Sequence, residues 1–244
     1  SNEYTGINQY QIISNSINRY MVMNQVVGLS NPSAMLFGCG NMNDFGTYID
    51  AKCSRIIAID NNSRVLNDKY CGAGSILSSS YSDVVKKLRY NTLFINADVG
   101  TDITDPLLTE DEDFGVDSIN GFYLDIIYGR EKVSEMETKK LRRFENIGVE
   151  GVHMIIGGEN ILNSVYATEE KLDNFLTNIA TNLKDQGFFM TTFLDGFKVC
   201  EALTASGEDK LHLVNNKHGQ VVYEFVGEKE TSIINYNITK DGHI

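Results

Sequence analysis

The sequence predicts an α/β domain built on a mainly parallel sheet, with an antiparallel elaboration near the C-terminus. Short apolar runs alternate with segments of helical spacing, which is the pattern of strands joined by crossover helices. The runs are almost uninterrupted, as expected for strands covered on both faces, and they lie at 34–37, 56–59, 92–95, 152–156 and 188–194. A chain of 244 residues can bury a sizeable core, so we expect a single domain.

The clearest helix is predicted over 169–184. Thr168 is placed to cap its N-terminus, and acids fill its first turn. Gly187 is expected to end the segment, and weaker helical spacing occurs at 62–70 and 80–89. Apolar residues recur on one face of the main helix at intervals of three and four: Leu172, Phe175, Leu176, Ile179 and Leu183.

The hydrophobic pattern of the sequence changes after residue 200. Apolar and polar residues alternate through about 208–240, which is typical of half-buried antiparallel strands. A turn signal at 216–219 separates two of these strands. The stretch at 105–117 is rich in acids and has no packing pattern, so we expect an exposed loop there.

The net charge of −12 argues against non-specific binding to nucleic acid, which depends on neutralising phosphates. It does not exclude a local basic groove. Two runs, 84–89 and 139–143, carry clustered lysine and arginine. Solvated helix faces are the preferred interpretation of both runs.

The cysteines and histidines predict no metal site. Neither residue type shows zinc-ligand spacing, and His153 falls inside a predicted strand as a satisfied core residue. The cysteines indicate reduced thiols in an intracellular protein, with a disulfide set as the alternative; they are Cys39, Cys53, Cys71 and Cys200. No stretch has the length of a membrane span. The start at Ser1, without methionine, suggests a domain of a longer protein.

A glycine turn follows the first predicted strand. Gly38 and Gly40 would let backbone amides approach a ligand without interference from a Cβ atom. Asp60 ends the next strand about 20 residues later, the spacing at which an acid binds ribose hydroxyls. Asp98 follows the third strand in the same way. The alternative interpretation is that both acids cap helices.

The ligand that this loop favours is an adenosine without a phosphate. A pyrophosphate requires a third glycine beside a helix N-terminus, and Asn43 stands at that position. No phosphate-loop lysine is present either. S-adenosylmethionine (SAM) is the obvious compound of this kind.

With these features the chain resembles the Rossmann-fold SAM-dependent methyltransferases. More narrowly, it is similar to the mRNA cap guanine-N7 methyltransferase domain in capping enzymes of large DNA viruses, such as poxviruses. Four stretches carry the resemblance: 11–23, 34–45, 176–203 and 221–238.

The resemblance implies a domain layout within a longer capping enzyme. An N-terminal helix covers about 8–24, a SAM-binding core about 33–200, and an antiparallel insertion beside the cap pocket about 208–240. It implies capped RNA as a partner, guanylyltransferase and triphosphatase domains on the same chain, and a location in the host cytoplasm or the virion. Neither a metal nor a membrane is implied.

The resemblance also implies two sets of site residues. The cofactor set combines the loop and the two acids with neighbouring positions: Asn18, Arg19, Gly38, Cys39, Gly40, Asp60, Asn61, Asp98, Val99, Gly157 and Glu159. The cap set is Asn15, Asn163, Ser164, Tyr166, Asn235 and Tyr236. Guanine N7 has a lone pair and no proton, so we expect no catalytic nucleophile, acid or base.

The sequence departs from the family at several positions. Leu36 stands where many methyltransferases carry an acid for the methionine amino group, and Asn18 replaces the family lysine. Asn163 and Ser164 replace a His-Tyr pair, and Asn235 replaces the pocket glutamate. These changes leave room for altered cap recognition, weaker activity or a non-catalytic relative.

Three alternatives follow from these departures. The first is a SAM methyltransferase for another substrate, and the second is a non-catalytic subunit that stimulates an active partner. The third, an NAD-binding oxidoreductase, is disfavoured by the missing third glycine.

Overall fold

The computed structural model divides into two compact units, Asn18–Thr192 and Ser1–Ile17 with Phe193–Ile244. It describes residues 6–69, 72–79, 81–105, 118–134, 139–158, 161–192, 198, 201–202, 204–205, 210–216, 219–226 and 233–239.

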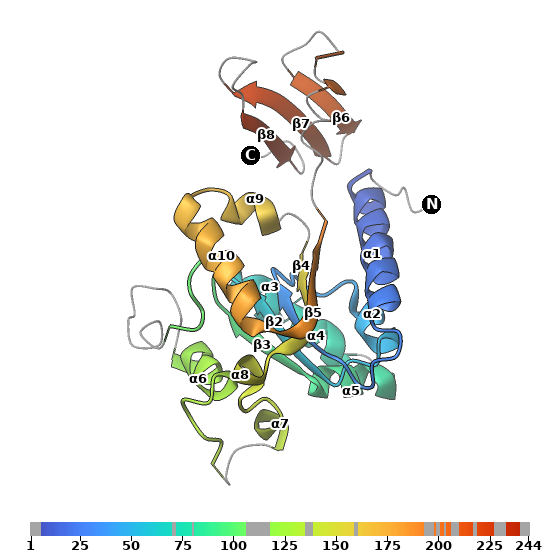
Figure 1. Cartoon of the computed structure of the whole chain (residues 1–244). Helices are drawn as coiled ribbons and strands as arrows, with labels where there is room; N and C mark the ends of the chain where they lie inside the picture. Colours follow the sequence, from blue (N-terminus) through green and yellow to red (C-terminus); the bar gives the residue numbers. More distant parts are fainter. Residues whose placement is uncertain are drawn as a thin grey trace. The chain divides into compact units, whose positions relative to one another are not determined.

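The larger unit contains a parallel sheet with helices on both sides (Figure 1). Its five strands lie in the order β3-β2-β1-β4-β5. Its strands confirm the five predicted apolar runs: β1 (Ser33–Phe37), β2 (Arg55–Asp60), β3 (Thr92–Asn96), β4 (Val152–Gly157) and β5 (Leu183–Thr191). The chain lays β2 and β3 on one side of β1 and then crosses to add β4 and β5 on the other. The direction of winding therefore switches between β1 and β4, where open α/β sheets bind ligands.

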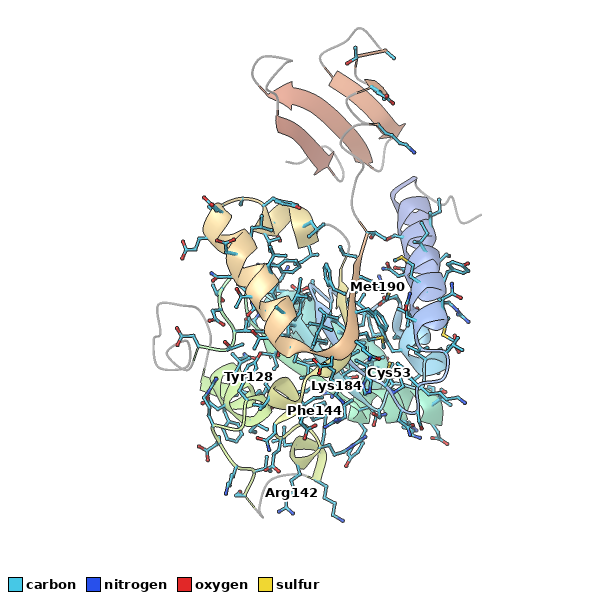
Figure 2. All side chains as sticks on the ribbon, in the orientation of Figure 1. Cys53, Tyr128, Arg142, Phe144, Lys184 and Met190 are labelled. Atoms are coloured by element: carbon cyan, nitrogen blue, oxygen red, sulfur yellow. The ribbon has the colours of Figure 1, made fainter. Side chains whose placement is uncertain are left out.

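The strands bury both faces, because successive side chains along a strand point to opposite sides. On one face, Phe37 and Ile59 pack with Phe175 of α10 (Glu169–Asn182). On the other face, Leu36 and Ala58 pack with Val22 of α1 (Gly6–Gln25). Helices α6 (Ser118–Ile127) and α8 (Ile147–Glu150) share the first face, and α2 (Phe45–Asp50), α4 (Ala73–Ser79) and α5 (Asp83–Tyr90) share the second. Figure 2 shows Tyr128 and Phe144 among the helices of the first face and Cys53 beside those of the second.

The main predicted helix is confirmed in α10. The hydroxyl oxygen of Thr168 accepts a hydrogen bond from the backbone amide of Lys171 over 3.2 Å, as the N-cap prediction requires. The helix ends at Asn182, and Leu183 already has extended dihedral angles and opens β5. The prediction that the helix reaches 184 and the strand begins at 188 was therefore wrong. The backbone extends earlier because Leu183 pairs with Val152 of β4.

Shorter helices complete the described part of the larger unit. The helical spacing at 62–70 and 80–89 corresponds to α3 (Ser63–Asn67) and α5. The helix α7 (Lys139–Arg142) covers the basic run that was interpreted as a helix face, whereas α2, α4, α6, α8 and α9 (Ile161–Val165) were not predicted. Most of the acidic stretch at 105–117 lies outside the described residues.

The smaller unit contains an antiparallel sheet of its own, in the order β6-β7-β8. Its strands are β6 (Lys210–Asn216), β7 (Gly219–Val226) and β8 (Ile233–Thr239). The turn signal at 216–219 falls between β6 and β7, where Asn216 pairs with Gly219. These strands do not extend the five-stranded sheet, which is parallel throughout.

The helices within the described ranges include none with both the length and the apolar character needed to cross a membrane.

Candidate functional site

The glycine loop leaves the sheet at the switch point and is bound to both neighbouring strands. The backbone amides of Gly38 and Cys39 donate to the carbonyl of Ile59 over 2.9 and 3.1 Å. On the other side, the amide of Gly158 donates to the carbonyl of Phe37 over 2.7 Å. These bonds hold the loop across the carboxyl ends of β2, β1 and β4.

The two glycines of the loop serve different purposes. Both have positive φ angles, +69° at Gly38 and +54° at Gly40, which favour glycine. A Cβ atom at Gly38 would lie 2.9 Å from Cδ1 of Ile161, so this position is enclosed by protein. A Cβ atom at Gly40 would meet nothing within 4 Å. Gly40 is therefore the position at which a ligand can approach the backbone.

Asp60 lies against this open position. Its Oδ2 accepts a hydrogen bond from the amide of Gly40 over 2.8 Å, and its Oδ1 accepts one from the amide of Asn62 over 2.9 Å. Each carboxylate oxygen can accept a further hydrogen bond. The alternative that Asp60 caps a helix was wrong, because Asn62 is the N-cap of α3 and accepts from the amide of Arg64. Asn61, the other predicted residue here, is exposed.

The carboxylate of Asp98 has one partner in its own loop and one on α10. Its Oδ1 accepts from the amide of Gly100 over 2.8 Å, and its Oδ2 lies 3.2 Å from Nζ of Lys171 on α10. The ion pair is partly exposed, so it contributes little to stability. Val99 was predicted to contact the cofactor, but its side chain is buried in the core and its carbonyl accepts a hydrogen bond from Asn178.

Asn178 holds the loop that carries Asp98, and sequence reasoning missed it. Its Nδ2 donates to the carbonyls of Val99 and Thr101 over 3.0 and 2.7 Å. Its Oδ1 accepts from the amide of Ile103 over 3.2 Å. The side chain is fully buried, so these bonds are shielded from water. The sequence contained one cue for this role, because Asn178 is a polar residue beside Ile179 on the apolar face of α10.

Asp44 is a second acid near the glycine loop, beside Asp60, and sequence reasoning missed it. Its Oδ2 accepts a hydrogen bond from the hydroxyl of Tyr48 over 2.9 Å, and burial raises the pKa of its carboxyl. Burial, followed by the charges of Asp60 and Asp44, raises the pKa of the Cys39 thiol well above its usual value. Cys39 therefore lies within electrostatic range of two carboxylates. The available signal was an acid ending the loop with a tyrosine one helical turn later.

Leu36 cannot take the role of the acid that many methyltransferases carry at its position. Its side chain is 2% exposed and belongs to the core face that includes Val22 and Met42. Any residue here points into this packed layer.

The two predicted cofactor residues of α1 have different surroundings. Asn18 is 6% exposed, and its Oδ1 has no hydrogen-bond partner among the described residues. A buried amide oxygen without a partner is unfavourable, so it marks a place where a donor from a ligand would fit. Arg19 instead forms a partly exposed ion pair with Asp50, with 2.6 Å between Nη2 and Oδ2. The structure thus gives the Arg19 charge a partner on α2.

The end of β4 packs tightly against the glycine loop. A Cβ atom at Gly158 would fall 1.9 Å from the carbonyl oxygen of Gly38, so a side chain has no room there. Gly157 is enclosed by Thr191 and Ile161, with the nearest atom 2.7 Å from a Cβ. Its predicted contact with the cofactor is therefore limited to the backbone. Glu159 lies outside the described residues.

The predicted cap residues belong to both units. In the larger unit, Tyr166 is 62% exposed, and the hydroxyl of Ser164 donates to the carbonyl of Ile161 in its own helix. Asn15 is half-buried in the smaller unit. The side chains of three residues lie outside the described part: Asn163 on α9, and Asn235 and Tyr236 on β8, where they pair in register with Glu224 and Tyr223. The cap set therefore stays a prediction.

The histidine prediction is confirmed in part for the one histidine whose side chain is described, because His153 has a hydrogen-bond partner in the sheet but is only half-buried. Nδ1 of His153 accepts from the amide of Ser33 over 3.1 Å and lies 2.9 Å from its hydroxyl oxygen. Burial lowers the pKa of His153, and the charges of Lys184 and Arg55 lower it further. Within the described residues, histidine, cysteine and acid side chains do not gather in any group that could hold a metal ion.

This chain resembles known proteins in structure and not in sequence. No family model and no curated protein matches the sequence. The CcbJ methyltransferase of Streptomyces caelestis matches with a TM-score of 0.50 and 10% identity, over 92% of this chain and 67% of its own. The fold is that of the Rossmann-like methyltransferases.

Two further neighbours of this fold score lower. A SAM-dependent methyltransferase of Clostridium acetobutylicum has a TM-score of 0.45 and 11% identity, over 97% of this chain and 81% of its own. The glycopeptide N-methyltransferase MtfA in complex with SAM has a TM-score of 0.42 and 7% identity, over 92% and 71%. At such identities the likeness concerns the Rossmann-like fold alone. The strand order of the chain itself places the glycine loop and Asp60 at the carboxyl ends of the strands, where open α/β sheets bind ligands.

Proposed function

We propose that this chain is a SAM-dependent methyltransferase. The observation that carries the proposal is the contact between Gly40 and Asp60 at the switch point of the sheet. It combines an open backbone position with a carboxylate whose remaining lone pairs suit ribose hydroxyls. The loop has neither the third glycine nor the lysine that a phosphate would require.

The residues around the loop fit the rest of the cofactor. The methionine end of SAM carries an ammonium group, which the carboxylate of Asp44 and the unpaired Oδ1 of Asn18 can accept. Asp98 would stand on the adenine side, as the acid that follows β3. When bound, SAM supplies a methyl group on a sulfonium centre.

For the methyl acceptor we propose guanine N7 of an mRNA cap. The proposal rests on the sequence resemblance and on the chemistry of the site. N7 attacks through a lone pair, so the protein has only to position the base and exclude water. Accordingly, no residue is assigned as a general base. The acids at the strand ends would favour the positive charge that develops on the base.

A non-catalytic, partner-stimulating subunit is the second candidate. It is supported by the ion pair that Lys171 makes with Asp98, which occupies one of the cofactor acids. Retention of SAM separates the two candidates, because a decayed site would not bind it.

Calorimetry with S-adenosylhomocysteine, the demethylated cofactor, tests the proposal. We expect saturable binding with a dissociation constant on the order of micromolar, typical of small-molecule sites. Absence of binding by both SAM and its product would refute the cofactor assignment. A transfer assay then compares GpppRNA with the same RNA uncapped. Methylation of the uncapped RNA alone would refute the cap assignment and leave the cofactor assignment intact.

A further inference from the structure

A cavity lies at the opposite end of the parallel strands from the glycine loop. Its volume is about 780 Å³, and Ser54 and Asn91 are among its lining residues. These two residues directly precede β2 and β3, so the cavity lies at the amino ends of the strands. Gly40 and Asp60 lie at the carboxyl ends. The cavity is therefore separate from Gly40 and Asp60, although Tyr48 in its lining donates to Asp44 of the proposed cofactor site.

The charge of this cavity is positive in a protein whose net charge is −12. Three cations line it: Lys52, Lys87 and Arg143. Asp83 is the one acid among the lining residues, and it lies 3.6 Å from Lys86 outside the cavity lining. In the described part of the chain, the three lining cations form no ion pair, whereas five other cations do.

Arg143 is held in place without losing its charge. Its Nη1 donates to Oδ1 of Asn91 over 2.7 Å, and its Nη2 donates to the carbonyl of Ser54 over 2.8 Å. The guanidinium also lies 5.1 Å from the ring centre of Tyr90. All these partners are uncharged, so the guanidinium is fixed in direction while its positive charge stays uncompensated. Such a group is pre-organised for an anion.

The neighbouring side chains add to the positive field. Nζ of Lys140 donates to the carbonyl of Arg89 over 3.2 Å. Burial lowers the pKa of Lys140 to about 8, and the charges of Arg89 and Arg143 act in the same direction. Nε of Arg89 is buried and has no hydrogen-bond partner among the described residues. Lys140 and Arg143 belong to the basic run at 139–143, and Lys87 and Arg89 to the run at 84–89. The tertiary structure thus brings both runs to one cavity, although several of their cations are exposed, as expected for solvated helix faces.

The floor of the cavity is apolar. Tyr48, Cys53 and Leu88 are buried there, and Val84 is 53% exposed at the rim. The volume is within the range of small-molecule sites, roughly 300–1,000 Å³. A bare inorganic anion would leave this apolar surface uncovered. The cavity therefore suits an anion attached to an apolar or aromatic body.

We propose that this cavity binds a nucleotide, either free or as a unit of an RNA strand. The phosphate would lie against Lys52, Lys87 and the fixed guanidinium of Arg143, and the base against the apolar floor. Lysine and arginine bind phosphate through charge-assisted hydrogen bonds. This site is independent of the methyl-transfer reaction and stands whether or not the chain binds SAM.

The test measures binding of uridine 5′-monophosphate, uridine and a ten-residue oligouridylate to the whole chain by calorimetry. Uridine compounds are used because the proposed cofactor and cap sites would take adenosine and guanine. We expect the monophosphate to bind about tenfold more tightly than uridine, because only the monophosphate meets the cations. Equal affinity of the two would overturn the proposal.

Substitutions locate the binding. The double variant Lys52→Gln and Lys87→Gln should weaken monophosphate binding by about tenfold, the effect of losing charge-assisted contacts. The matched control is Arg64→Gln with Lys132→Gln, which removes the same charge from exposed cations outside the cavity lining. An equal loss in both variants would show general attraction and overturn the site. An oligouridylate affinity above that of the monophosphate identifies an RNA strand as the ligand, and equal affinities identify a free nucleotide.

Discussion

The backbone amide of Gly40 donates to Oδ2 of Asp60 over 2.8 Å, although twenty positions separate the two residues. The bond joins the loop after β1 to the end of β2. The backbone of Asp60 is itself held from β3, since its carbonyl accepts from Nδ2 of Asn96 over 2.7 Å. The position of the carboxylate is therefore set by three consecutive strands of the sheet. This arrangement leads to the first of four predictions.

Replacement of Asp60 by asparagine should weaken the binding of S-adenosylhomocysteine by about ten- to a hundredfold, the value of hydrogen bonds to a charged group. The amide removes the charge and replaces one acceptor oxygen by a donor, so it cannot keep the bonds to Gly40 and Asn62 and also bind the ribose hydroxyls. Calorimetry measures the change. The control is Asp173→Asn, at an exposed position of α10. Similar losses in the two variants would mean that Asp60 does not bind the ribose.

The close approach of Gly158 to Gly38 predicts a strong effect of an added methyl group. Gly158→Ala would place a Cβ atom 1.9 Å from the carbonyl oxygen of Gly38, and the backbone would have to move. We expect a loss of at least about 1–3 kcal/mol in the free energy of unfolding, as for overpacked cores. Urea denaturation measures it.

Gly46→Ala is the control for this substitution. Gly46 lies in α2, where a Cβ atom would meet nothing within 4 Å. Alanine there should leave the protein as stable as before or raise its stability by about 0.4–1 kcal/mol. Equal stability of the Gly158 and Gly46 variants would contradict the packing seen at the end of β4.

Asn178 predicts a stability effect from lost hydrogen bonds. Asn178→Ala leaves the carbonyls of Val99 and Thr101 and the amide of Ile103 without this partner. Each unsatisfied buried group costs about 1–3 kcal/mol unless water replaces the bond, so we expect a fall of at least about 2 kcal/mol in the free energy of unfolding. Thr177→Ala, exposed on the same helix, should change it by less than about 0.5 kcal/mol. Thermal denaturation compares the two, and matching curves would count against the role of Asn178.

Lys140 predicts a dependence of stability on pH. Its pKa is about 8 in the folded protein against an ordinary 10.5. Between these values the unfolded chain binds more protons, so this residue makes the protein more stable as the pH rises. Below pH 8, as the pKa of about 8 implies, charged Lys140 is destabilising.

The variant Lys140→Met should therefore be more stable than the original protein at neutral pH. Its advantage should shrink as the pH rises through the pKa of about 8 towards 10.5. Chemical denaturation at several pH values measures the difference. The exposed Lys139→Met is the control and should show no such trend. A constant difference across the pH range would show that the pKa of Lys140 is not lowered.

The strands and the loop were predictable because their signals are local. A parallel strand covered on both faces must be apolar along its length, and the five runs were read correctly for that reason. The glycines of the loop were predictable because a turn with positive φ angles favours glycine. Asp60 was predictable because it ends the second strand. Strand boundaries were less secure, as Leu183 shows: its pairing with Val152 outweighed the helical spacing before it.

The partners of polar side chains came only from the tertiary structure. The sequence could not show that Leu36 faces the core, that Lys171 reaches Asp98, or that Arg19 reaches Asp50. Nor could it show that the basic runs of α5 and 139–143 meet at one cavity. Such contacts depend on segments that are distant in the chain and are brought together by the crossovers of the sheet. Apolar periodicity determined the architecture, whereas the folded arrangement of the strands decided which charges are paired and which remain free to bind a ligand.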